Sequence, residues 1–90
     1  MNKAYLITYD MNSNDDYSGL EMEIRKYRRW CRVLTKTWII ISNETPFEIW
    51  NNLKGEINKN NGFFIIEIKN NSEGWLSREI WDWIKENVEN

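Results

Sequence analysis

Histidine is absent from this sequence of 90 residues, and cysteine occurs once, at Cys31. A Ser-His-Asp triad, a Cys-His nucleophile pair and a Cys/His zinc site within one chain are therefore excluded. A single thiol cannot form an intramolecular disulfide, which predicts a small core residue and a reducing compartment. Any catalysis would use carboxylates with a hard cation such as Mg²⁺ or Mn²⁺, or else Lys, Tyr or Ser.

Long apolar runs are missing as well. No stretch approaches the roughly 20 residues of a membrane-spanning helix, and the first residues lack the basic start and cleavage site of a signal peptide. We therefore expect a cytoplasmic protein with no membrane partner, and one domain over residues 1–90. The six Trp, four Tyr and three Phe either share one core or partly cover a second face or a subunit contact.

The segment Ala4–Asp10 reads Ala-Tyr-Leu-Ile-Thr-Tyr-Asp and is apolar on both faces. This pattern predicts a central strand that is buried on two sides. Turn-forming residues follow it, and Ser18 with Glu21 resembles a capping box at the start of a helix. Apolar residues at helical spacing extend that helix over about residues 19–29.

Residues 30–42 change to two β-rich runs around the short polar break Thr35-Lys36. They predict a hairpin, although one long bent strand fits the same pattern because the break lacks Asn-Gly or Asp-Gly. A second helix is expected over residues 46–58, because its start carries the capping signals Thr45, Pro46 and Glu48. A fourth strand is predicted over residues 63–69 and a third helical pattern from Trp75 onward.

The predicted order is strand, helix, strand, strand, helix, strand and a terminal helix. This order is typical of an α+β ferredoxin-like βαββαβ sandwich with an added C-terminal helix. In such a sandwich the helices leave the second face of the antiparallel sheet bare. Because the strands carry apolar residues on both sides, we expect a homodimer or higher homo-oligomer through that face.

The net charge of −2 hides a segregated basic cluster. Six of the twelve basic residues fall between positions 25 and 36, and aromatic residues interleave with them. Guanidinium groups hold phosphate and aromatic rings stack on bases, so the cluster predicts a site for nucleic acid or a small nucleotide. A solvated helix face with core aromatics explains the same pattern. The candidate binding residues are Arg25, Tyr27, Arg28, Arg29, Trp30 and Arg32.

Asp10 ends the first predicted strand and is the candidate catalytic residue and metal ligand. A carboxylate at this position can hold Mg²⁺ or Mn²⁺ with a companion carboxylate, and two such residues across a dimer axis would clamp a phosphate. Asp15 and Asp16 are the nearest companions in sequence. Asp is also a common strand-ending residue, and acids before a helix favour its dipole, so a structural role stays open.

The sequence carries a family resemblance. The predicted order of elements, with a first strand reading Tyr-Leu-Ile-Thr-Tyr-Asp at positions 5–10 and a hairpin over residues 32–39, resembles the CRISPR-associated protein 2 and VapD-like superfamily. More closely, the chain resembles small SinR-like proteins of phages and mobile elements, in which a Tyr-Asp strand end, a Thr-Trp strand and a Gly-Trp-Leu before the last helix recur. Here these are Tyr9-Asp10, Thr37-Trp38 and the tripeptide at positions 74–76. The resemblance implies dimers formed through the sheet face. It also implies a metal-dependent nuclease with Asp10 as the acidic residue.

The chain departs from the CRISPR-adaptation members of that superfamily, since a Trp-rich helix stands where they add a fifth strand. Three functions therefore stay open. The first is a metal-dependent nuclease that uses Asp10. The second is a non-catalytic module that binds nucleic acid or sequesters a signalling nucleotide. The third is a protein interaction module that uses the exposed sheet and the terminal helix.

Overall fold

The computed structural model describes residues 2–10, 16–58 and 61–89. They form an α+β structure with a four-stranded antiparallel sheet and three α-helices, as the sequence predicts. The strands, in the sheet order β2-β3-β1-β4, are β1 (Lys3–Tyr9), β2 (Arg29–Leu34), β3 (Thr37–Ser42) and β4 (Phe63–Ile68). The helices are α1 (Ser18–Arg25), α2 (Pro46–Leu53) and α3 (Arg78–Asn87), and a short 3-10 turn, η1 (Lys54–Glu56), follows α2. No helix in these ranges is long and apolar enough to cross a membrane.

The first strand is central, because β1 pairs with β3 on one side and with β4 on the other. Its alternate residues enter two different cores. Tyr5 and Ile7 are buried on the side of α1 and α2, and Ala4 is buried on the side of α3. A strand with apolar residues on both faces has to be covered twice, which confirms the prediction for this segment.

The hairpin is confirmed, and the alternative of one long bent strand is wrong. β2 and β3 run antiparallel around Thr35-Lys36, with a register shift between Arg32 and Leu34. The α2 cap is confirmed too. The Thr45 hydroxyl accepts from the Glu48 amide, and the Glu48 carboxylate accepts from the Thr45 amide.

The α1 cap differs from its prediction. Ser18 is the first residue of the helix, and the backbone N–H of Ser18 donates to Asp16 Oδ1 at 2.9 Å. The cap position is occupied by Tyr17, whose side chain makes no capping bond. The aspartate two residues earlier thus replaces the expected Ser18–Glu21 box, and Glu21 is free to bind arginine.

All three helices are also shorter than predicted. The first helix ends at Arg25 rather than 29, because a turn and then β2 follow it. The second ends at Leu53, after which η1 tightens the chain. The third begins at Arg78 rather than near Trp75. In the first two helices the apolar spacing continues past the last helical hydrogen bonds, and in the third it starts before the first one, so the pattern overestimates the length.

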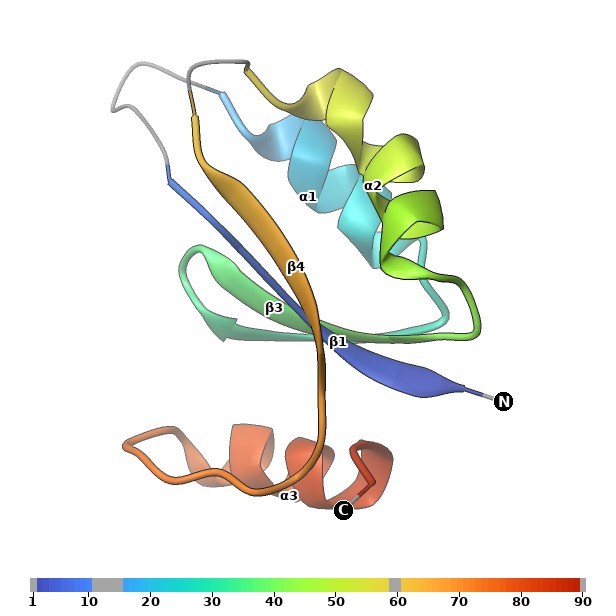
Figure 1. Cartoon of the computed structure of the whole chain (residues 1–90). Helices are drawn as coiled ribbons and strands as arrows, with labels where there is room; N and C mark the ends of the chain where they lie inside the picture. The colour runs from blue at the N-terminus through green and yellow to red at the C-terminus, as the bar shows by residue number, and fades with distance from the viewer. Residues whose placement is uncertain (1, 11–15, 59–60, 90) are drawn as a thin grey trace.

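The expected bare second face is wrong, because α3 lies on it. Figure 1 shows α1 and α2 on one side of the sheet and α3 on the other. Ile84 and Val88 from the C-terminal region pack with Ala4, Ile39 and Ile41 of the sheet. Trp81 and Trp83 pack against this second cluster as partly buried residues, so some aromatics do cover the second face.

Candidate functional site

The predicted basic cluster is divided by β2. Alternate side chains of a strand point to opposite faces of the sheet. Trp30 pairs with Ile40 of the α1/α2 core, whereas Arg29 pairs with Ile41 of the α3 core. On the α3 side, Arg29 Nη1 donates to Asn87 Oδ1 at 3.0 Å. The structure therefore does not bring Arg29 together with Trp30 on one surface.

Arg32 lies on the α1/α2 face, and its guanidinium is bound by the protein itself. Its Nη2 donates to Glu21 Oε2 at 2.6 Å and to the Thr35 carbonyl at 2.8 Å, and its Nε donates to the same carbonyl at 3.1 Å. The guanidinium carbon lies 5.0 Å from the centre of the Trp38 ring, within the range of a cation–π contact. Arg32 thus ties β2 to α1 and holds a fixed orientation.

Arg25 and Trp30 form an accessible part of the cluster on the α1/α2 face. The Arg25 guanidinium carbon lies 5.6 Å from the Trp30 ring centre and 5.3 Å from that of Trp38. The Arg25 side chain is 43% exposed and Trp30 is 36% exposed. Trp38 is fully buried beneath them, and its ring centre is 5.6 Å from that of Trp30. A guanidinium and part of an indole ring are thus accessible to solvent above the buried Trp38.

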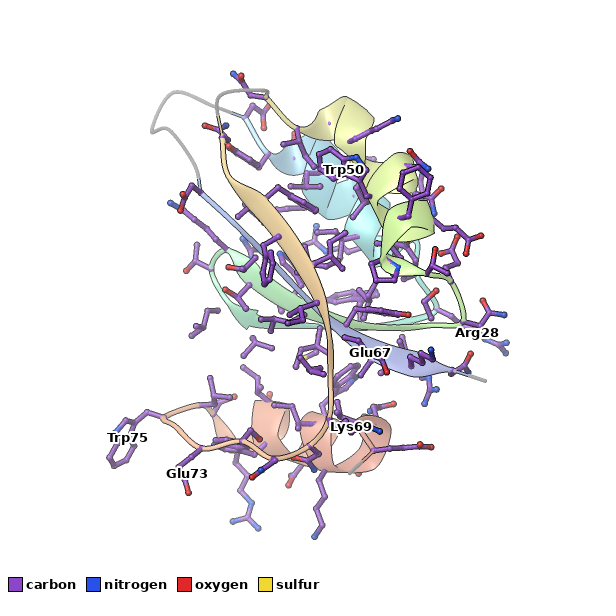
Figure 2. All side chains as sticks on the ribbon, viewed as in Figure 1. Arg28, Trp50, Glu67, Lys69, Glu73 and Trp75 are labelled. Carbon is purple, nitrogen blue, oxygen red and sulfur yellow. The ribbon has the colours of Figure 1, made fainter. Side chains whose placement is uncertain are left out.

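The charge of this surface is positive. Glu21 faces both Arg25, at 3.9 Å, and Arg32, at 2.6 Å. One carboxylate therefore meets two guanidiniums, which leaves an unbalanced positive charge. Arg28 adds another in the turn between α1 and β2, where it is exposed (Figure 2). We name Arg25, Arg28 and Trp30 the arginine–tryptophan surface.

Tyr27 is placed on a different part of the α1/α2 layer. Its ring packs against the core as a partly buried side chain, and its hydroxyl accepts from Asn52 Nδ2 at 3.1 Å. Burial is the main cause that raises the pKa of this hydroxyl. Tyr27 lines a shallow groove of about 300 Å³ with Glu23, Lys26 and Asn52. Its contacts are those of a residue joining α1 to α2.

Asp10 follows directly on β1 and is exposed. Its backbone N–H donates to the Gly62 carbonyl at 2.9 Å, and its own carbonyl accepts from the Tyr17 hydroxyl at 3.1 Å. The carboxylate lies close to Gly62, because a Cβ at that glycine would stand 3.1 Å from Asp10 Oδ2. The backbone at the end of β1 is thus fixed, while the carboxylate faces solvent.

Of the two predicted companions of Asp10, the structure describes only Asp16. Asp15 lies outside the described residues. Asp16 accepts from the Ser18 amide, which lowers the pKa of its carboxyl group. Within the described ranges no three Asp, Glu, Cys or His side chains form a group able to hold a metal ion. Asp10 alone supplies one or two of the roughly six oxygen ligands of Mg²⁺, so the metal site stays a prediction.

A groove of about 600 Å³, which no sequence pattern predicts, lies where the ends of β1, β4 and α3 meet. Charged residues of both signs line it, including Lys3 and Glu67, whose side chains are 3.8 Å apart. Arg29 reaches it from β2 and Lys69 from beyond β4, where Figure 2 shows it below Glu67. Because the lining residues come from five separate segments, no local motif marks the groove.

Comparisons with protein-family models, with curated proteins and with solved structures found no match. The likeness of the short motifs to the CRISPR-associated protein 2 superfamily therefore stands as a resemblance alone, and the function has to be argued from the residues.

Proposed function

We propose that this chain is a ferredoxin-like protein that binds a single strand of nucleic acid at the arginine–tryptophan surface. The observation that carries the proposal is the Arg25 guanidinium over the accessible Trp30 ring, with Arg28 exposed in the adjoining turn. The strand order β2-β3-β1-β4, with β1 and β3 central, supports the ferredoxin-like assignment.

The chemistry of the surface suits a single strand better than a duplex. An exposed indole stacks on an unpaired base, which a duplex does not offer, and such stacking contributes about 1–3 kcal/mol per base. Guanidinium groups such as those of Arg25 and Arg28 bind phosphates in bidentate geometry. Arg32, already bound to Glu21 and Thr35, positions Trp38 beneath the surface and is not expected to contact the ligand.

Fluorescence anisotropy with a labelled single-stranded RNA, a duplex DNA and a panel of signalling nucleotides tests this proposal. Each phosphate contact contributes a slope of about −0.7 to the dependence of log K on log salt for single strands. The double variant Arg25→Ala/Arg28→Ala should therefore weaken RNA binding and reduce the slope by about 1.4. Trp30→Ala should weaken binding and leave the slope unchanged.

The matched control is Lys54→Ala/Arg78→Ala, which removes two exposed positive charges from η1 and α3. It should leave binding within a factor of two of the parent. Equal loss in both double variants would show a nonspecific effect of net charge. Absence of any binding by the parent would contradict the proposal. A shallow salt dependence with strong reliance on Trp30 would point to a small nucleotide in place of a strand.

A metal-dependent nuclease is the second candidate, and the exposed Asp10 carboxylate at the end of β1 favours it. Cleavage of RNA or DNA should then require Mg²⁺ or Mn²⁺ and fall more than 100-fold in Asp10→Asn. Asp82→Asn is the control, because it removes an equal charge from an exposed position on α3, on the other side of the sheet from α1 and α2. Metal-independent cleavage, or equal loss in the two variants, would remove Asp10 from the mechanism.

The proposal also includes a cytoplasmic location and self-association of the chain. The Cys31 thiol is buried, and its pKa is raised by burial, which suits an unreactive thiol in a reducing cytoplasm. A homodimer or higher oligomer stays a prediction. The sheet face that was expected to form it is partly covered by α3, which leaves only part of that face available for self-association.

A further inference from the structure

The two edges of the sheet differ in how they are protected. β2 and β4 are the edge strands, and within the described residues each pairs with one neighbour, β3 or β1. An edge strand carries a row of outward backbone N–H and C=O groups that can pair with another chain. Proteins that stay monomeric usually block such an edge with charges, prolines, bulges or covering segments.

The β2 edge has several of these features. A register shift between Arg32 and Leu34 interrupts the ladder and bends the strand. Arg29 and Arg32 place a guanidinium on each face, one bound to Asn87 of α3 and the other to Glu21 of α1. Both side chains tie the edge to a helix on its own face.

The β4 edge has only one of them, the charge of Glu67. Its sequence Phe-Phe-Ile-Ile-Glu-Ile contains no proline and one charge, and its register with β1 is regular from Phe63 to Ile68. Figure 1 shows β4 in front of the other strands, with α1 and α2 on one side and α3 on the other. No described segment crosses in front of it. The outward backbone groups of β4 are thus accessible along its length.

Large apolar side chains stand beside this open edge. Phe64 is 55% exposed and Ile66 is 44% exposed. They lie opposite Thr8 and Leu6, so they share the α3 face of the sheet with Ile68. Only Ile68 packs against the α3 cluster, which leaves the other two side chains uncovered.

The opposite face adds a further apolar surface. Trp50 of α2 contacts Phe63 at the start of β4, with ring centres 5.5 Å apart, and it stays partly exposed (Figure 2). Phe47, one turn earlier on α2, is also exposed. A strand added to β4 would therefore meet apolar side chains on both of its faces.

We propose that a second copy of this chain pairs with β4, strand against strand and antiparallel, so that two sheets join into one. The two β4 strands can pair with each other around a two-fold axis that passes beside Ile65. Phe64 of each copy then lies opposite Ile66 of the other copy, which gives two such pairs, one on each side of the axis. Aromatic–β-branched pairs of this kind stabilise a sheet by about 0.2–1 kcal/mol each.

The same register keeps the two Glu67 carboxylates apart. Glu67, the single charge in β4, faces Phe63 of the second copy at each end of the interface. The two Glu67 carboxylates are then four residue positions apart, about 13 Å at the rise of an antiparallel strand. Like charges directly opposite each other would destabilise the pair, and this register avoids that contact.

The area available sets the expected strength. An aromatic side chain buries about 150–250 Å² when fully covered, so the exposed parts of Phe64 and Trp50 offer roughly 150–200 Å² per copy. With the backbone and Ile66 added, the total remains under about 1,200 Å², which is typical of weak complexes. We therefore expect a dimer that dissociates in the micromolar range.

Sedimentation at protein concentrations from a few to several hundred micromolar tests the interface. Phe64→Lys should weaken association at least tenfold, because it places two positive charges beside the joined edges. Leu34→Lys is the matched control, since Leu34 is 56% exposed and lies on the other edge strand. It should leave association unchanged. Ile66→Lys serves as a second variant if Phe64→Lys fails to fold by circular dichroism.

A disulfide cross-link between the two copies tests the proposed register of the paired β4 strands. Residues opposite each other in an antiparallel pair have Cα atoms about 4.5–5.5 Å apart, within the range of a disulfide. Ile65→Cys in a Cys31→Ser background should form a covalent dimer under mild oxidation, and Leu34→Cys should not. A parent that is monomeric at several hundred micromolar would overturn the proposal. So would a dimer that is lost in Leu34→Lys and kept in Phe64→Lys.

Discussion

The two faces of the sheet are covered to different depths. Among the residues that the structure describes, eight large side chains are almost completely inaccessible, and all of them belong to the cluster beneath α1 and α2. The α3 cluster has five buried residues, and each of these retains between 4% and 7% of its surface. The α1/α2 layer is therefore the main core, and α3 acts as a thinner cover.

Geometry explains this difference. Four strands at a spacing of about 4.8 Å make a sheet roughly 19 Å wide, while one helix with its side chains is about 10 Å across. Two helices side by side cover such a sheet, and a single helix covers about half of it. The uncovered half of the α3 face includes Phe64 and Ile66. Because α3 alone covers this face, apolar side chains of β4 remain exposed there.

Ile49→Ala should give the largest loss of stability. Ile49 is completely buried in the α1/α2 cluster, and truncation in a rigid core leaves a cavity that neighbours cannot fill. We expect the free energy of unfolding to fall by about 4 kcal/mol. Urea unfolding followed by circular dichroism measures the change. A loss below about 2 kcal/mol would show that this core repacks readily.

Ile84→Ala is the matched change in the other layer. Ile84 occupies the apolar side of α3 and is 6% exposed, with the partly buried Trp81 and Trp83 close by. Those rings can move into the space, so we expect a smaller loss of about 2 kcal/mol. Unfolding of both variants under the same conditions tests the comparison. Equal losses would contradict the distinction between a main core and a cover.

Removal of the helix caps of α2 and α3 should give smaller losses of stability than the core substitutions, again with the larger loss in the α1/α2 layer. Thr45→Ala removes the α2 capping box and should cost about 1 kcal/mol. Ser77→Ala removes a single bond of 3.3 Å from the Ile80 amide to the Ser77 hydroxyl at the start of α3, and it should cost less. Chemical denaturation of the two variants gives both values. A larger effect at Ser77 would reverse the order of the two layers.

Alkaline pH should affect the α1/α2 layer and have no effect near neutrality. Burial is the main cause that raises the pKa values of Tyr5, Tyr9 and Tyr27, all in or against this core. A raised pKa in the folded state gives stability that is complete below the unfolded value of about 10 and is lost as pH rises through the folded value. The urea midpoint should therefore fall above about pH 10.

Tyr5→Phe is the control for this pH effect. The Tyr5 hydroxyl donates to the Glu44 carbonyl at 2.6 Å, and the ionised oxygen cannot donate. The variant should be less stable than the parent at pH 8 and should show a shallower decline between pH 10 and 11. A midpoint in the parent that stays constant to pH 11 would contradict the expected coupling.

Local patterns in the sequence predicted most of the fold. The apolar run of β1, the two runs of the hairpin and the Thr45 cap depend on neighbouring residues, so the sequence shows them directly. The position of α3 depends on the path of residues 69–77, which carry the chain from the end of β4 to the second face. No periodicity encodes that path, and the bare face was predicted wrongly for this reason.

The candidate site was predictable in part. The period of two in β2 separates Arg29 from Trp30 and Arg32, and a strand assignment beginning at Arg29 would have shown this separation. The capture of Arg32 by Glu21 depends on how α1 lies over β2, eleven residues away in sequence. Sequence spacing could not show which arginine is held by the protein and which remains available.

The central place of β1 has a consequence for the nascent chain. At about 5–20 residues per second, β4 is synthesised roughly 3–12 seconds after β1. β3 appears earlier and can pair with one side of β1, while the other side waits for Phe63–Ile68. During that interval an apolar strand has an open edge and incomplete cover on both faces. Until the ribosome has delivered β4, the half-made sheet is therefore a substrate for chaperones and a starting point for aggregation.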